Sequence, residues 1–244
     1  MPVEILKKVL FELCVESLSS AQAAERGGAD RVELCTSLEI GGVTPTEELT
    51  ATTIQSLRIP VHVLIRPRGG DFVYSPAEFE QIRQQIDWVK KAGAAGVVLG
   101  VLLADGRVDV ARSRELVALA RPMKVTFHRA FDETSDKAEA LEAVIETGAD
   151  CLLTSGGAPD VLTGAEVLGK LVRQAGERIQ IMAGGGLRLT NLVEVLDRSS
   201  VPCLHGSLTE RGSERENVYG DDAAILEADV RTVVGLLSCQ LKPE

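Results

Sequence analysis

The sequence predicts a single (β/α)8 barrel that spans residues 1–244. Eight short apolar runs alternate with eight helical patterns at about 30 residues per unit, and such alternation indicates a parallel sheet. Gly28, Gly93 and Gly148 each follow a helical pattern directly before an apolar run, where a helix terminator is expected. The length suits one closed barrel, and no Gly-x-Gly-x-x-Gly motif opens the first helix as in a dinucleotide-binding sheet.

The elements are assigned from apolar periodicity and from turn residues. The strand-like runs are rich in β-branched residues, and the helical stretches carry apolar residues at helical spacing. Capping boxes at Thr44/Glu47 and Ser75/Glu78 predict two helix starts. We expect strands at 11–15, 32–35, 60–66, 96–101, 123–128, 151–154, 179–183 and 203–205. We expect helices at 19–27, 45–56, 76–92, 109–120, 136–147, 161–174, 191–197 and 222–238.

Composition limits the partners of the protein. Acidic residues (36) outnumber basic ones (26), and the net charge of −10 disfavours a surface for nucleic acid or for anionic membranes. The first eight residues are too few and too charged for a secretory signal, and no apolar run reaches the roughly 18 residues of a membrane span. The five cysteines are odd in number and scattered, unlike a disulfide framework. These features favour a cytoplasmic protein with reduced thiols.

One short phrase occurs twice near the start of the chain. Glu12-Leu13-Cys14 ends the first predicted strand, and Glu33-Leu34-Cys35 ends the second, with a helical pattern between them. Strands joined in this way are parallel neighbours, and alternate residues point to one face. If the two registers match, Glu12 lies beside Glu33 and Cys14 lies beside Cys35.

Polar residues gather at the carboxyl ends of the predicted strands. This end of the barrel, here called the mouth, is where active sites of (β/α)8 proteins lie. The strand starts are mostly apolar, so the asymmetry predicts a site at the mouth. The residues at the strand ends are Glu12, Cys14, Glu33, Cys35, Arg66, Arg68, His128, Arg129, Thr154, Ser155, Gly184, Gly185, Gly186, His205 and Ser207.

Several long motifs resemble those of a known family. The sequence contains both Glu-Leu-Cys phrases, Arg-Pro-Arg-Gly-Gly-Asp-Phe at 66–72, Phe-His-Arg-Ala-Phe-Asp at 127–132, Leu-Thr-Ser-Gly-Gly at 153–157, Ala-Gly-Gly-Gly at 183–186 and His-Gly-Ser at 205–207. In this order and over nearly the whole chain, they resemble the CutC family, which is named for copper homeostasis. The resemblance implies a cytoplasmic (β/α)8 barrel that self-associates and handles copper through its paired cysteines.

Copper chemistry fits the paired cysteines. Cu(I) is a soft ion that prefers thiolate ligands, so Cys14 and Cys35 are the candidate metal ligands and Cu(I) the candidate cofactor. The competing interpretation is that each thiol packs in the core as a small apolar side chain. Because no Cys-x-x-Cys motif is present, an exposed metallochaperone loop is not expected.

The alternative function is an enzyme that acts on a small anionic metabolite, either phosphorylated or not. The candidate catalytic residues are Glu12, Glu33, Arg66 and His128, because paired carboxylates and a histidine supply general acid and base. The glycine-rich strand ends resemble phosphate-binding turns, although tight turns need glycine in any case. Arg66 and Arg68 could equally form ion pairs within the protein. The candidate anion-binding residues are Arg68, Ser155, Gly156, Gly184, Gly185, Gly186, Gly206 and Ser207.

Overall fold

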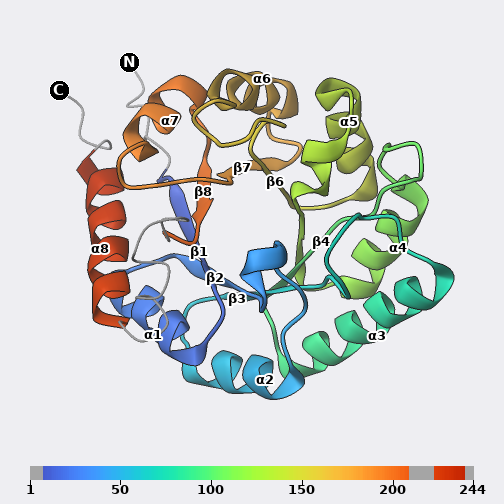
Figure 1. Cartoon of the computed structure of the whole chain (residues 1–244), viewed down its shortest axis with the longest axis horizontal. Coiled ribbons are helices and arrows are strands. Elements are labelled where there is room, and N and C mark those ends of the chain that lie inside the picture. Colours follow the sequence, from blue (N-terminus) through green and yellow to red (C-terminus); the bar gives the residue numbers. More distant parts are fainter. Residues whose placement is uncertain (1–7, 209–222, 240–244) are drawn as a thin grey trace.

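The chain folds into a closed barrel of eight parallel strands. The computed structural model describes residues 8–208 and 223–239. The strands are hydrogen-bonded in chain order from β1 to β8, and β8 pairs with β1 to close the barrel. The helices surround this central ring of strands (Figure 1). The predicted (β/α)8 barrel is therefore confirmed.

The secondary structure follows a regular alternation. The strands are β1 (Leu10–Val15), β2 (Arg31–Leu34), β3 (Val61–Leu64), β4 (Gly96–Leu99), β5 (Lys124–Phe127), β6 (Cys151–Thr154), β7 (Gln180–Gly184) and β8 (Cys203–Gly206). The α-helices are α1 (Leu18–Gly27), α2 (Glu47–Ser56), α3 (Pro76–Ala92), α4 (Val110–Ala120), α5 (Lys137–Thr147), α6 (Ala165–Ala175), α7 (Leu192–Ser199) and α8 (Ala223–Cys239). Two 3₁₀ helices, η1 (Leu38–Ile40) and η2 (Arg129–Glu133), follow β2 and β5 and were not predicted.

Helix starts depend on side-chain caps, and two of the predicted starts need correction. The capping box of Ser75 and Glu78 at α3 is present as predicted. Helix α2 begins two residues later than expected, because Thr46 is its N-cap and accepts a hydrogen bond from the Leu49 N–H. Helix α6 begins at Ala165 rather than at 161, after a run of turns.

Helices α1 and α8 pack side by side and close the outer layer (Figure 1). Gly27 permits their close approach, because a Cβ atom at this position would lie 2.6 Å from Val230 Cβ. Gly28 ends α1 in the left-handed conformation, with φ of 94°. None of the described helices combines the length and the apolar character that a membrane crossing requires.

Alternate residues of each strand point into the barrel and outward toward the helices. In β1, Phe11, Leu13 and Val15 belong to the main hydrophobic core, while Glu12 and Cys14 do not. Inside the barrel, two separate apolar clusters form around sulfur atoms. The first contains Cys14, Cys35, Leu64 and Val98, and the second contains Cys151, Leu153, Met182 and Cys203.

Candidate functional site

The first two strands are staggered by two residues relative to the predicted register. Glu12 lies opposite Arg31, and Cys14 lies opposite Glu33. The expectation that Glu12 pairs with Glu33 was therefore wrong. The strands of a closed barrel are tilted, so neighbouring strands shift along one another by an amount that chain order does not reveal. An even shift keeps the same side chains inside the barrel, as the strand period of two requires.

The structure brings the thiols of Cys14 and Cys35 together. Their Sγ atoms lie 3.5 Å apart, with Cys35 fully buried and Cys14 8 % exposed. Cys35 follows β2 directly, and its N–H donates to the Val15 carbonyl at 3.0 Å, which fixes it beside β1. The hydrogen bond with Cys35, burial, and the charges of Glu33 and Glu12 raise the pKa of the Cys14 thiol. A metal that binds here must therefore displace a proton.

A row of interacting ionisable side chains crosses the barrel interior beside the thiols. Arg31 Nε donates to Glu12 Oε2, and Glu12 Oε1 accepts from His205 Nδ1 at 2.7 Å. On its other side, His205 Nε2 lies 3.3 Å from Glu33 Oε2. His205 is thus held between two carboxylates, which fixes the orientation of its ring.

Neighbouring charges shift the pKa of each of these interacting side chains. Burial alone would raise the pKa of Glu12, but the Arg31 guanidinium and the hydrogen bond from His205 hold it well below its usual range. Burial and the Glu12 charge raise the pKa of Glu33 to about 7, against the opposing effect of His205. Burial disfavours the charged imidazole of His205, yet Glu33 and Glu12 raise its pKa.

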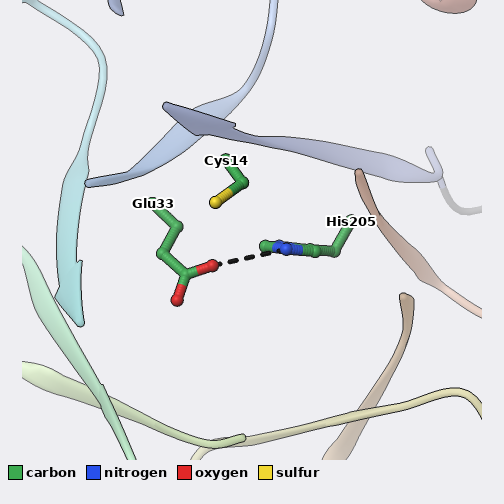
Figure 2. Close-up of side chains that lie close together, drawn as sticks. All are labelled: Cys14, Glu33 and His205. Carbon is green, nitrogen blue, oxygen red and sulfur yellow. Dashed lines mark ion pairs between the residues drawn. The ribbon is translucent and has the colours of Figure 1, made fainter. Parts of the chain in front are cut away.

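Three of these side chains converge on one point. Figure 2 shows Cys14 of β1, Glu33 of β2 and His205 of β8 directed toward the same space. Their Sγ, carboxylate oxygen and ring nitrogen atoms all lie within 4.8 Å of one another, close enough to share a metal ion. His205 was placed at the predicted mouth but was given no role there, and Arg31 was not predicted at all. His205 could have been recognised because it occupies a strand end at the mouth, whereas Arg31 begins its strand, where the prediction expected apolar residues.

A cavity of about 390 Å³ lies above the thiol pair, at the mouth of the barrel. Three of the four predicted catalytic residues, Glu33, Arg66 and His128, line this cavity, whereas Glu12 is fully buried and does not. The polar lining comes from strands and loops that are far apart in the sequence. The lining residues with polar side chains or glycine are Cys14, Glu33, Cys35, Gly41, Arg66, His128, Arg129, Asp160, Gly185, Gly186, Arg188, His205, Gly206 and Ser207.

Arg66 and Arg68 are engaged within the protein. Arg66 Nη1 donates to the carbonyls of Ile40 (3.1 Å) and Gly42 (2.9 Å), and its Nη2 donates to the Gly70 carbonyl at 2.7 Å. Arg66 thereby fastens two loops to the wall of the cavity. The guanidinium of Arg68 contacts the carboxylates of Glu78 and Asp71, and Arg68 does not line the cavity.

The predicted anion-binding residues fall into two groups. Gly185, Gly186, Gly206 and Ser207 line the cavity, whereas Ser155, Gly156 and Gly184 do not. The Ser155 side chain is buried and is hydrogen-bonded to the carboxylate of Asp132 and the carbonyl of Ala158. Gly184 makes room for a neighbour, because a Cβ atom there would lie 2.5 Å from Leu153 Cδ1 and 3.1 Å from His205 Cβ.

His128 is a buried neutral histidine. Its Nδ1 accepts from the Ala130 N–H at 3.2 Å, so the proton of the neutral ring sits on Nε2. Burial and the nearby Arg66 charge lower the pKa of His128 to about 3. Among the described residues, Nε2 has no hydrogen-bond partner.

The lowered pKa of His128 makes a prediction about stability in acid. The unfolded histidine takes a proton near pH 6.5, while the folded one stays neutral down to about pH 3. The stability contribution is therefore present above pH 6.5 and is lost as the pH falls. Between pH 7 and pH 5, wild type should lose about 2 kcal/mol of unfolding free energy relative to His128→Asn, which keeps an acceptor for the Ala130 N–H. Urea denaturation at both pH values measures this effect. The prediction is contradicted if the unfolding free energies of wild type and His128→Asn differ by the same amount at both pH values.

Comparisons with known proteins identify the same family, over most of the chain. Residues 9–210 match the CutC family. A family protein CutC from Chromobacterium violaceum is 47 % identical over 198 residues, which cover 81 % of this chain and 80 % of that protein. A human copper homeostasis protein cutC homolog is 46 % identical over 198 residues, covering 81 % and 72 %. The crystal structure of CutC from Streptococcus agalactiae superposes with a TM-score of 0.78 at 30 % identity, covering 82 % of this chain and all of that one. The chain therefore belongs to the CutC family, which is associated with copper homeostasis.

Proposed function

We propose that this protein binds Cu(I) through the thiolates of Cys14 and Cys35 as part of copper homeostasis in the cytoplasm. The observation that carries the proposal is the 3.5 Å separation of the two Sγ atoms, both on residues that line the cavity. In this proposal, copper is the ion that the protein binds and handles. Membership of the CutC family supports copper as the metal.

The chemistry of the surrounding donors supports a soft, monovalent ion. Thiolates select Cu(I), and an imidazole nitrogen also suits copper. His205 is within reach of the Cys14 sulfur and would supply that nitrogen once its proton is lost. Harder ions prefer carboxylate oxygen as a ligand. Glu33 therefore serves better as the hydrogen-bond partner that orients His205. A buried site of this kind suits holding the ion more than exchanging it rapidly.

We further propose that the protein self-associates. Ile40, Val73 and Leu103 are large apolar side chains that are exposed on three successive loops after β2, β3 and β4. Exposed large apolar side chains favour burial against a partner. Sedimentation velocity would give the mass of the particle, and a monomer at all concentrations would contradict this part of the proposal.

Copper binding is tested by an anaerobic Cu(I) titration against a competing chelator. Wild type should bind close to one equivalent tightly, and the Cys14→Ser/Cys35→Ser variant should lose this binding because a hydroxyl is a poor ligand for a soft ion. Cys239→Ser is the matched control, since Cys239 is an exposed cysteine on α8. Equal binding by wild type and the double variant would contradict the two-cysteine site.

A further inference from the structure

The cavity at the mouth is larger than a two-thiol copper site requires. Its volume of about 390 Å³ lies in the range typical of small-molecule sites. The thiols, Glu33 and His205 account for only part of its lining. We propose that the remainder binds a small organic anion, with one ligand oxygen at His128 Nε2–H and the anionic group near Arg188 and Arg129.

His128 supplies the first argument, because it is a buried donor without an acceptor. The residue is 5 % exposed and lines the cavity, and its Nε2 has no partner among the described residues. A buried donor left without an acceptor costs about 1–3 kcal/mol. A hydroxyl or carbonyl oxygen of a ligand in the cavity would accept this hydrogen bond.

The ring of His128 is also fixed in place before any ligand arrives. Its Nδ1 is held by the Ala130 N–H, and its ring centroid lies 4.8 Å from that of Phe72. Gly100 lies against the Nδ1–Cε1 edge of the ring, where a Cβ atom would be 2.5 Å from Nδ1. The donor therefore keeps one orientation, which reduces the entropy that a ligand loses on binding.

The second argument is the positive charge at the rim of the cavity. Arg188 is exposed, and its guanidinium makes no hydrogen bond with the described residues. Arg129 is held in place, with Nε on Asp132 at 2.7 Å and Nη2 on the Ser155 hydroxyl at 3.3 Å. Its guanidinium packs on the face of Gly185, where a Cβ atom would be 2.8 Å from Cζ.

These two features define the ligand class. The guanidinium groups suit a phosphate or a carboxylate, and His128 suits an uncharged oxygen because the ring is neutral and can only donate through Nε2. Asp160 also lines the rim and offsets part of the Arg188 charge. The ligand is thus a hydroxylated or carbonyl-bearing organic anion of a few carbon atoms.

The test uses calorimetric titration of the copper-free protein with four probes. 2-Phosphoglycolate and glycerol 3-phosphate carry a phosphate, lactate carries a carboxylate with a hydroxyl, and inorganic phosphate lacks the distal oxygen. We expect at least one organic anion to bind with Kd below about 1 mM and more tightly than inorganic phosphate. Binding of lactate alone identifies a carboxylate site, and binding of the phosphate esters identifies a phosphate site.

Matched variants then assign the site. His128→Asn keeps an acceptor for the Ala130 N–H and removes the Nε2 donor, so it should weaken binding about tenfold. His128→Gln restores an amide donor near the Nε2 position and should recover most of the affinity. Arg188→Ala should weaken binding about tenfold, while Arg58→Ala, an exposed arginine just before β3 at the other end of the barrel, should change nothing.

Two results would overturn the proposal: binding of none of the four probes, or binding that neither His128→Asn nor Arg188→Ala weakens. Both results are independent of copper. His128 and Arg188 are not copper ligands, so the Cu(I) titration of His128→Asn should match that of wild type. A protein that binds copper but no anion contradicts only the anion site. A protein that binds the anion but no copper contradicts only the copper site.

Discussion

Replacement of Arg31 by leucine is expected to lower the free energy of unfolding by about 3–5 kcal/mol. Glu12 is fully buried, and the Arg31 guanidinium is the charge that keeps its carboxylate ionised. Without Arg31, the buried carboxylate is left uncompensated, or it takes a proton and its bond with His205 weakens. The guanidinium also contacts Met182 Sδ at 3.2 Å, and this contact would be lost.

An exposed ion pair provides the control for Arg31. Arg26 contacts Glu227 at 2.8 Å between α1 and α8, and its side chain is about half exposed. Arg26→Ala should cost at most about 1 kcal/mol, because surface pairs gain little over their hydration. The Glu12→Gln/Arg31→Leu double variant should recover part of the loss, since no charge is then left unpaired. Urea denaturation measures all three, and an Arg31→Leu cost no larger than that of Arg26→Ala would contradict the account.

Replacement of Asp132 by alanine is expected to cost about 3 kcal/mol of stability and to weaken the anion site. Its Oδ1 accepts from the Thr154 hydroxyl and from the N–H groups of Ser155 (3.2 Å) and Gly157 (3.1 Å). Its Oδ2 accepts from Arg129 Nε at 2.7 Å and the Ser155 hydroxyl at 3.0 Å. Alanine removes the acceptor of the Thr154 hydroxyl, of the Ser155 and Gly157 N–H groups and of Arg129 Nε, which leaves Arg129 held, among the described residues, only by the Ser155 hydroxyl at 3.3 Å.

Asp136 is the matched control for Asp132. It lies four residues later, and its carboxylate accepts from only two N–H groups, those of Ala138 (2.9 Å) and Glu139 (3.0 Å), as the N-cap of α5. Asp136→Ala should therefore cost about 1 kcal/mol, the usual price of a helix cap, and should leave anion affinity unchanged. Denaturation and calorimetry of the two variants check both expectations. Similar losses of stability and of anion affinity from both variants would contradict the larger role assigned to Asp132.

The fold was predictable because it depends on local patterns. Alternating strand and helix signals, glycine terminators such as Gly28 and the capping box at Ser75 are all set by neighbours in the sequence. The closeness of Cys14 and Cys35 was predicted from a matched register. The register is shifted by two residues, but this even shift keeps both side chains on the inner face, and their Sγ atoms still lie 3.5 Å apart. The observed helix boundaries differ from the predicted ones where turns precede a helix, as at the start of α6 at Ala165.

The detail of the site depends on distances that local patterns do not contain. The two-residue stagger of β1 and β2 places Arg31, and not Glu33, beside Glu12. His205 reaches both carboxylates only because β8 closes the barrel onto β1, a contact between residues nearly two hundred positions apart. Arg66 was expected to meet a ligand or a carboxylate, but the loop carbonyls of Ile40, Gly42 and Gly70 surround it.

X-ray absorption at the copper K-edge tests the central claim most directly. The sample is the wild-type protein loaded anaerobically with less than one equivalent of Cu(I). The proposed site predicts two sulfur neighbours, from Cys14 and Cys35, with room for one nitrogen from His205. A spectrum with nitrogen or oxygen neighbours alone, or a sulfur count that is unchanged in Cys14→Ser/Cys35→Ser, would contradict it.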